Sequence, residues 1–308
     1  MARPLLRGDE RPTWVLLAAC YATWLAATAG LAAGSEIVAV LCVVPAILAT
    51  ALHASLQHEA LHGHPTRSAL LNEALVFPAP GLLYPYRRFR EMHLRHHDDA
   101  RLTDPYDDPE SWYLAEADAR ALAGPLRWAL EANRTLLARM VLGPWLGAAG
   151  LATADLRALR AGAPRIAGAW ARHAAGVGLV LAWLVASGVN PVLYALAVAW
   201  PAASLIYVRT FIEHRAAEAP GHRTAVVEAG WFWSLMFLNN NLHAVHHAEP
   251  NLAWHRLPER WRARREAVLA RNGGHRVPGY GVVFRRWLLA PREPLVHPFR
   301  RREPPPAS

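Results

Sequence analysis

Four long apolar segments dominate the hydrophobic pattern of the chain, at residues 13–33, 37–56, 166–189 and 192–212. Each is close to the roughly 20 residues that a helix needs to cross a bilayer. Only residues 34–36 separate the first two segments, and Asn190-Pro191 separates the last two. The pattern therefore predicts four transmembrane helices arranged as two hairpins.

Arginine placement predicts how these helices are oriented. The two hairpin links contain no Arg, whereas the N-terminal tail, the middle segment and the C-terminal segment contain nearly all of it. Because positively charged flanks stay on the cytoplasmic side, we expect both termini and the middle segment to be cytoplasmic. The sequence thus predicts a multi-pass protein of the plasma (inner) membrane.

Two further apolar stretches are interrupted. Residues 69–85 contain three prolines and a glycine, and residues 140–154 contain Pro144 between Arg139 and Asp155. We expect both to form interfacial helices that lie on the membrane. The predicted fold is an all-α integral membrane protein with a single domain over residues 1–308. A cytoplasmic helical cap from 57–165 and 213–297 would hold a di-metal site, and the Arg- and Pro-rich tail 298–308 would be disordered.

Composition agrees with a membrane protein. Hydrophobic residues make up 53% of the 308 residues, and the net charge is +9. All 33 basic residues are Arg and flank apolar blocks, so anionic lipid is the expected partner and nucleic acid is not. The two cysteines, Cys20 and Cys42, lie inside apolar blocks and predict no disulfide framework.

Eight of the 16 histidines fall into three tight groups. An HxxxH motif follows the second apolar segment, one HxxHH motif lies in the middle segment, and another follows the fourth apolar segment. Residues i, i+3 and i+4 share one face of a helix, so each group could present two or three imidazoles to one point. The members are His58, His62, His93, His96, His97, His243, His246 and His247.

Eight imidazoles without cysteine suggest more than one metal ion. A single zinc ion normally takes four ligands, whereas imidazole-rich sites also serve iron and copper. Neighbouring carboxylates could orient the rings. The sequence does not choose among the candidates, which are Glu59, Asp98, Asp99, Asp104, Asp107, Asp108, Glu213 and Glu249.

The series HxxxH, HxxHH, HxxHH, with this placement relative to the apolar segments, resembles the membrane fatty acid desaturase and hydroxylase superfamily. The resemblance covers residues 53–258, where Gln57 opens the first motif and residues 239–242 (Asn-Asn-Asn-Leu) lead into the third. It implies a four-helix transmembrane stalk below a cytoplasmic cap that holds two non-haem iron ions. Dioxygen would be the oxidant.

The resemblance implies that the eight grouped histidines are metal ligands. Family members often use one more histidine upstream of the third motif, and His214 is the matching position. Asn240 could hold a metal-bound water, although Asn239 and Asn241 are equally placed, and Glu59 or Glu213 could support the ligands. His64 would be a supporting or a turn residue, and His53 a functional or a core histidine.

The expected activity is desaturation of a fatty acyl lipid. A hydroxylase or ketolase acting on an alkyl chain or a carotenoid is the alternative, because these enzymes share the three motifs. The chain shows no fused haem or ferredoxin module. The electron donor would therefore be separate and of ferredoxin, flavodoxin or cytochrome b5 type.

Two other classes fit parts of the sequence. The segment 58–62 also matches HExxH, in which Glu59 would be the general base of a zinc metallopeptidase. That interpretation leaves both HxxHH motifs unexplained. A non-enzymatic metal-binding or transport protein would need ligands within the spans, whereas most histidines here follow the span ends.

Overall fold

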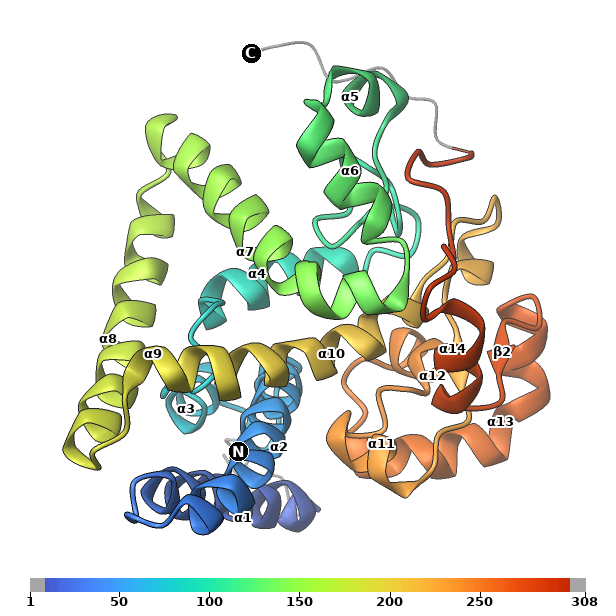
Figure 1. The fold of residues 1–308 in the computed structure, drawn as a ribbon. Helices are drawn as coiled ribbons and strands as arrows, with labels where there is room; N and C mark the ends of the chain where they lie inside the picture. The colour runs from blue at the N-terminus through green and yellow to red at the C-terminus, as the bar shows by residue number, and fades with distance from the viewer. Residues whose placement is uncertain (1–8, 300–308) are drawn as a thin grey trace.

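The computed structural model describes residues 9–299. Residues 1–8 and 300–308 lie outside the described part, and the latter include most of the tail predicted to be disordered. Helices account for most of the described chain (Figure 1). Their order is α1 (Arg11–Leu31), α2 (Glu36–Leu61), α3 (Ala69–Leu75), α4 (Tyr86–His96), α5 (Glu116–Ala121), α6 (Gly124–Ala132), α7 (Leu136–Arg160), α8 (Pro164–Ala186), α9 (Pro191–Tyr194), η1 (Ala195–Ala199), α10 (Trp200–Glu213), η2 (Pro220–Arg223), α11 (Trp231–Met236), α12 (His243–Ala248), η3 (Trp254–Arg256), α13 (Leu257–Arg271) and α14 (Tyr280–Trp287).

Two short strands depart from the all-α prediction. Strands β1 (Val226–Val227) and β2 (Arg276–Val277) pair in parallel. Two residues are too few for the alternating pattern that identifies a strand in a sequence. The pair fixes the segment before α11 to the segment before α14.

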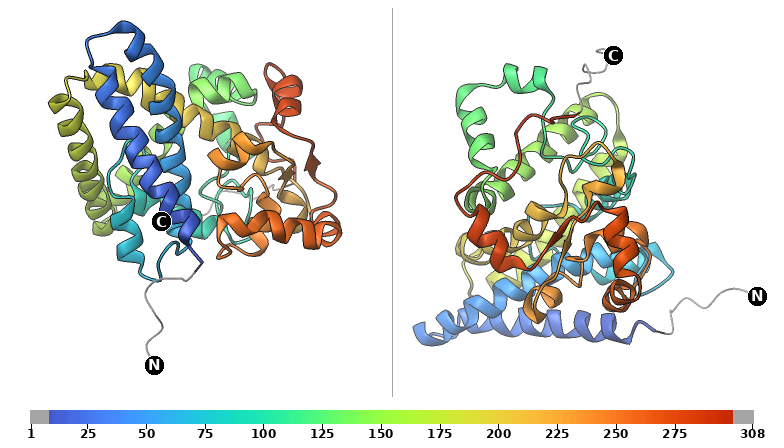
Figure 2. Two further views of the ribbon diagram at one scale, coloured as in Figure 1. Left: turned by 90° about the horizontal axis from the view of Figure 1, so that it is seen from below. Right: turned by 90° about the vertical axis from the view of Figure 1, so that its right-hand side faces the viewer.

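Helices α1 and α2 form the first predicted hairpin and lie side by side (Figure 2, left). Their shared core includes Leu17, Cys20, Leu52 and Leu56. Helix α2 extends past the predicted end at residue 56 and finishes at Leu61. His58 and Glu59 lie within this extension, and both side chains are buried. This extension places the first histidine motif at the end of the helix.

The second predicted hairpin consists of α8 and the continuous helix α9–η1–α10. Asn190 caps α9 by accepting hydrogen bonds from the amides of Val192 and Leu193. Five residues at 195–199 form a π-helix, and the Trp200 amide donates to the Ala195 carbonyl. Pro201 explains this turn, because proline has no N–H and its ring clashes with the carbonyl four residues earlier.

Helix α7 is longer than the interfacial helix predicted at 140–154. It has 25 residues, and both charged residues that bounded the prediction lie inside it. Asp155 does not end the helix, because its carboxylate is buried against the Arg88 guanidinium at 2.7 Å and accepts from the Trp170 indole at 2.8 Å. By length and composition, α7 is one of five helices that could cross a membrane, with α1, α2, α8 and α9–η1–α10.

A Gly-xxx-Gly motif allows α7 to approach α10 closely. A Cβ at Gly143 would lie 2.6 Å from the Tyr207 ring, and one at Gly147 would lie 2.3 Å from the Tyr207 hydroxyl. The Tyr207 hydroxyl in turn lies 2.7 Å from that of Tyr84. Small residues at such spacing are typical of helix contacts within membranes.

We expect Gly147→Val to destabilise the protein by about 1–3 kcal/mol, because the added methyl groups overpack the contact with Tyr207 and Tyr84. Thermal unfolding of the purified protein in detergent measures the effect. Gly150→Val is the matched control, because no atom lies within 4 Å of a Cβ at Gly150 on the same helix. Equal unfolding temperatures for the two variants would contradict the proposed contact.

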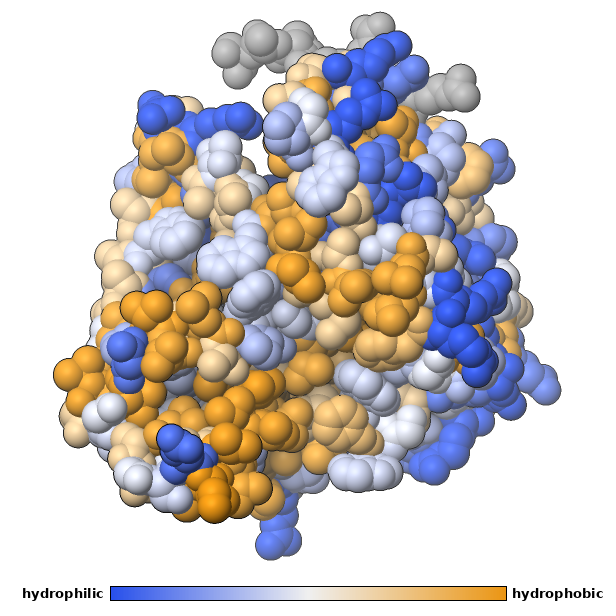
Figure 3. Space-filling model, in the orientation of Figure 1, coloured by the Kyte–Doolittle hydropathy of each residue, from blue (hydrophilic) through white to orange (hydrophobic). Residues whose placement is uncertain are grey.

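The surface separates into an apolar and a polar part. Hydrophobic residues cover the left and lower part of Figure 3, over α8, α9 and the first hairpin, and hydrophilic residues gather on the right. Ile37, Val40, Leu41, Val185 and Val192 are each at least 65% exposed. Such a broad exposed apolar surface is typical of a protein that contacts lipid. Helices α12, α13 and α14 lie at its polar side (Figure 1).

Candidate metal centre

The three histidine motifs and His214 lie on or directly after four helices, α2, α4, α10 and α12, whose histidines face one another. The first motif lies at the end of α2, the second on α4 and its end, and the third on α12. His214 follows the last residue of α10. The imidazoles form two groups of four that could each hold a metal ion.

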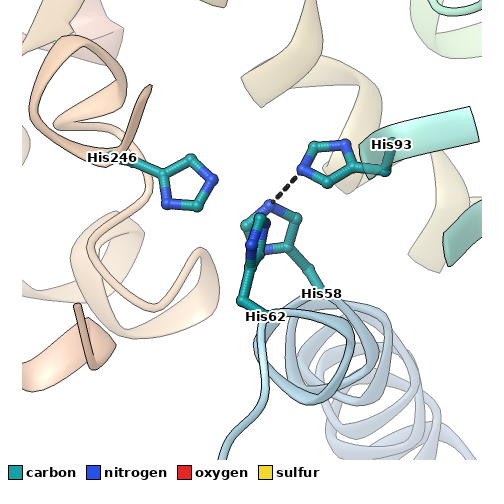
Figure 4. Close-up of side chains that lie close together, drawn as sticks. All are labelled: His58, His62, His93 and His246. Carbon is teal, nitrogen blue, oxygen red and sulfur yellow. Dashed lines mark hydrogen bonds between the residues drawn. The ribbon is translucent and has the colours of Figure 1, made fainter. Parts of the chain in front are cut away.

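The first group combines three motifs. His58 and His62 from α2, His93 from α4 and His246 from α12 point toward one another (Figure 4). One nitrogen of each lies within 4.8 Å of the others, and all four side chains are buried. The Nε2 atoms of His58 and His93 are 2.9 Å apart.

The second group contains His96, His214, His243 and His247. The His214 Nε2 lies 2.9 Å from the Nε2 of His96 and 2.9 Å from that of His243. His214 is therefore central to this group, as the resemblance implied. It was expected from its position and not from a motif of its own.

His97 belongs to neither group of four. Its Nε2 nevertheless lies 3.0 Å from the His93 Nε2 and 3.2 Å from the His246 Nε2, so it adds a fifth nitrogen beside the first group. Its ring also stacks on His247 with centroids 4.3 Å apart. His97 thus stands between the two groups.

The second and third motifs each bring two imidazoles together, as helical spacing predicted, but neither brings three to one point, because each motif is divided between the two groups. His93 lies in the first group and His96 in the second, although they are neighbours on α4. Likewise, His246 lies in the first group, whereas His243 and His247 lie in the second. Both groups lie beside α4 and α12, so side chains three residues apart on either helix reach different groups.

The nitrogen spacing fits metal coordination. Two nitrogens that are each about 2.1 Å from one ion, at right angles, lie about 3.0 Å apart. The contacts of 2.9–3.2 Å between Nε2 atoms match this spacing. In addition, the Nε2 atoms of His62 and His247 are buried without a hydrogen-bond partner in the described structure. Such converging lone pairs are suited to donate to a shared cation.

Burial favours the neutral, ligating form of most of these rings. Burial first, and then neighbouring imidazoles, hold the pKa of His62, His214, His243 and His246 well below its usual value. Burial lowers the pKa of His247 to about 4, although Asp99 opposes this shift. Neutral imidazoles bind metal without first losing a proton.

His96 differs, because two carboxylates face it. Burial acts to lower its pKa, but Asp108 and Glu110 outweigh burial and raise the pKa to about 9. The Asp108 carboxylate accepts from the His96 Nδ1 at 2.8 Å, which leaves the Nε2 directed at the second group. A metal ion at the Nε2 would replace the proton there, and Asp108 would stabilise either positive charge.

Each group has carboxylates behind its histidines. Asp99 lies 3.2 Å from the His247 Nδ1, and the Glu213 carboxylate lies 3.3 Å from the His243 Nδ1. The carboxylate of Glu110 accepts from the His93 Nδ1 at 2.9 Å. Sequence reasoning missed Glu110, because it lies 13 residues after His97 in an irregular segment. Only its position two residues after Asp108 could have suggested it.

The remaining carboxylate candidates have other partners. Glu59 accepts from the Trp254 amide at 2.9 Å. Asp98 pairs with Arg101, Glu249 pairs with Arg260, and Asp104 accepts from the amides of residues 106 and 107. Asp98 and Glu249 thus pair with arginines and contact no grouped histidine within residues 9–299.

Asn240 connects the two groups. Its Oδ1 lies 3.0 Å from the His243 Nδ1, and its Nδ2 lies 3.4 Å from the His58 Nε2. The neighbouring amides contact backbone carbonyls instead, Asn239 that of Trp254 and Asn241 that of Val227. Among the three asparagines, the structure thus favours Asn240 for a supporting role.

His53 and His64 lie outside both groups. The His53 Nε2 is 3.1 Å from the Tyr21 hydroxyl. His64 contacts the Glu10 carboxylate at 2.5 Å through Nδ1 and the Asn251 carbonyl at 3.0 Å through Nε2. Both are buried histidines with hydrogen-bond partners, which agrees with a structural role.

We expect Asp108→Asn to weaken metal binding at the second group by about 10- to 100-fold, because the carboxylate that orients His96 and compensates its charge is lost. Competition with a chelator measures metal release. Asp98→Asn is the control, because Asp98 is half exposed and pairs with Arg101. Identical chelator curves for both variants would show that Asp108 does not support a ligand.

Comparison with known proteins adds independent support. No curated protein matches the chain. A family model described as fatty acid desaturase matches residues 35–279, which is most of the chain. The match includes every histidine of the two groups and confirms the resemblance that the three motifs indicated. The chain therefore belongs to the fatty acid desaturase family.

Proposed function

We propose that the protein is an oxygen-dependent di-iron enzyme that introduces a double bond into a fatty acyl chain. A separate protein of ferredoxin, flavodoxin or cytochrome b5 type would supply the electrons. The family match supports an oxidoreductase that acts on lipid. The observation that carries the proposal is the assembly of two groups of four imidazoles beside one another.

The histidines would hold one iron ion in each group. His97 would complete the first group, and Asn240, which contacts His58 and His243, would hold a metal-bound water. When bound, the iron ions supply the oxidation of an unactivated C–H bond by dioxygen, which no side chain can perform alone. The protein positions the chain, orients the ligands through Asp99, Asp108, Glu110 and Glu213, and excludes water.

An open, mostly apolar pocket between α2, α10 and the segment 79–84 offers a surface on which an acyl chain could lie. Ala54, Leu83, Ala203 and Ile206 are among its apolar lining residues, and Tyr207 lies at its side. Such a largely apolar cavity next to a polar centre is the usual form of a small-molecule site.

The position of the site supports four crossing helices in two hairpins. His97 contacts His246, so the second and third motifs lie on the same side of any membrane. The chain between them must then cross an even number of times, and at most two of α7, α8 and α9–η1–α10 complete a crossing. With α1 and α2 as a further pair, both termini share the side of the site, which we propose to be cytoplasmic. We further propose that α7 does not cross.

A zinc metallopeptidase fits the geometry less well. The two histidines of the HExxH segment share their site with His93 and His246, whereas a catalytic zinc ion normally keeps three protein ligands and one open position. Glu59, the general base in that alternative, accepts a hydrogen bond from the Trp254 amide.

The test is product analysis with the purified, iron-loaded protein in lipid vesicles, supplied with reductant, dioxygen and a saturated acyl lipid. Mass spectrometry distinguishes the outcomes. Loss of two hydrogens shows a desaturase, and gain of one oxygen shows a hydroxylase of the same family. Dioxygen-independent activity, or a preparation that is active with one zinc ion per chain, would overturn the proposal.

A further inference from the structure

Arg139, in the first turn of α7, is a buried cation without a carboxylate partner. Its side chain is 7% exposed. The Nε donates to the Asn133 carbonyl at 3.1 Å, and the guanidinium lies over the Trp112 ring at 4.0 Å from its centroid. Within residues 9–299, no acidic group lies at ion-pair distance and no hydrogen bond reaches its two terminal nitrogens.

The other buried arginines of the described chain have partners. Arg209 pairs with Glu213 at 3.1 Å, and Arg223 donates to several backbone carbonyls, including that of Leu102 at 3.0 Å. A buried charge that lacks a partner is costly, and buried charges are normally paired or bound to another charged group. Arg139 is therefore a candidate for ligand binding.

The location of Arg139 indicates where such a ligand would sit. Arg139 lines a partly open cavity that also reaches His214 of the second histidine group and Glu110 behind the first. Two more arginines, Arg134 and Arg292, line the same cavity. It adjoins the positive end of the α7 dipole, which favours an anion.

The acidic residues of this cavity are already engaged. Asp108 accepts from His96, and Glu110 accepts from His93. Glu293 accepts from the Tyr113 hydroxyl at 2.9 Å and lies 3.8 Å from Arg292. None of these carboxylates lies at ion-pair distance from Arg139, so its guanidinium has no acidic partner within residues 9–299.

The acyl-chain cavity lies nearby. Both cavities are lined by α10, one by Ile206 and Tyr207 and the other by Thr210 and Phe211, about one helical turn further. The rings of Tyr207 and Trp112 contact each other between them, with centroids 6.0 Å apart. A lipid whose acidic end contacts Arg139 would have that end in the cavity that His214 lines, and its apolar chain could follow α10 toward the second cavity.

We propose that Arg139 binds the anionic end of the lipid substrate, a carboxylate or a phosphate group. This inference rests on the proposed function, because it names the substrate class of the same site. Neutral lipids such as esters, alcohols or hydrocarbons would bind less well. The bidentate guanidinium matches both anions.

Binding measurements test the proposal. The full-length, iron-loaded protein in detergent is titrated with palmitate and methyl palmitate, and separately with hexadecyl phosphate and hexadecanol. We expect the anionic member of at least one pair to bind about 10- to 100-fold more tightly than its neutral analogue. Preference for palmitate indicates a free fatty acid, and preference for the phosphate indicates a phosphorylated head group.

The variant Arg139→Met should abolish this preference and leave the affinity for the neutral lipid unchanged. It should fold, because methionine keeps the contact with Trp112 and removes a buried unpaired charge, so its unfolding temperature should not fall. Arg139→Lys, which keeps the charge, should retain part of the preference. Arg157→Met, at an exposed position of the same helix, is the matched control.

Equal binding of acidic and neutral lipids to the unsubstituted protein would overturn the proposal. Persistence of the preference in Arg139→Met would also do so. These measurements need neither dioxygen nor reductant. If the protein binds acidic lipid but does not oxidise it, the result contradicts the proposed function and leaves the binding proposal intact.

Discussion

Replacing His246 or His214 with alanine is expected to reduce activity by at least about 1000-fold, because each substitution removes a ligand from one histidine group. A metal ion that activates a reaction contributes several kcal/mol to catalysis, and each 1.4 kcal/mol corresponds to a factor of ten. The two variants should differ in metal content. His246→Ala should lose the ion of the first group, and His214→Ala that of the second.

Metal analysis of the purified variants, combined with product formation, measures both effects. His222→Ala is the control, because His222 lies in η2, belongs to neither group and packs beside Gly273. It should keep both ions and near-normal activity. Full iron content in His214→Ala would show that His214 is not a ligand.

Removing the metal ions is expected to lower the stability of the protein by about 4 kcal/mol, corresponding to roughly 10 °C in the unfolding temperature. Without an ion, imidazole nitrogens that lie 2.9–3.2 Å apart must share protons or remain unpaired in a buried site. Ions that bind only the folded state stabilise it by mass action, and their removal reverses this effect.

The measurement is thermal unfolding in detergent before and after chelation, followed by addition of ferrous iron. Iron should restore the original unfolding temperature. The double variant His214→Ala/His246→Ala should respond little to the chelator, because it has already lost ligands of both groups. An unchanged unfolding temperature after verified metal removal would mean that the histidine groups are held together by protein contacts alone.

Much of the molecule follows from local sequence properties. Four of the five long helices coincide with apolar segments of spanning length, because such segments must satisfy their backbone hydrogen bonds internally. The exception is α7, where the charges at Arg139 and Asp155 suggested helix ends. Asp155 is neutralised by Arg88, a residue 67 positions away, and no local pattern could reveal that contact.

The histidine motifs likewise show which features follow from local sequence and which do not. Their residue types and spacing indicated a metal centre, because imidazoles at i, i+3 and i+4 share a helix face. The spacing could not divide His93 from His96, or His246 from His243 and His247, between two groups. That division depends on where α2, α4, α10 and α12 meet, which is set by contacts between distant segments.

The residue pattern alone was thus enough to predict the family, the apolar helices and the histidines of the candidate metal centre. Tertiary packing determines which histidines share a group, which carboxylates contact them and where Arg139 lies. The physical reason is that helix formation and side-chain spacing depend on near neighbours, whereas Glu110, Asn240 and Arg139 gain their surroundings from segments far away in the chain.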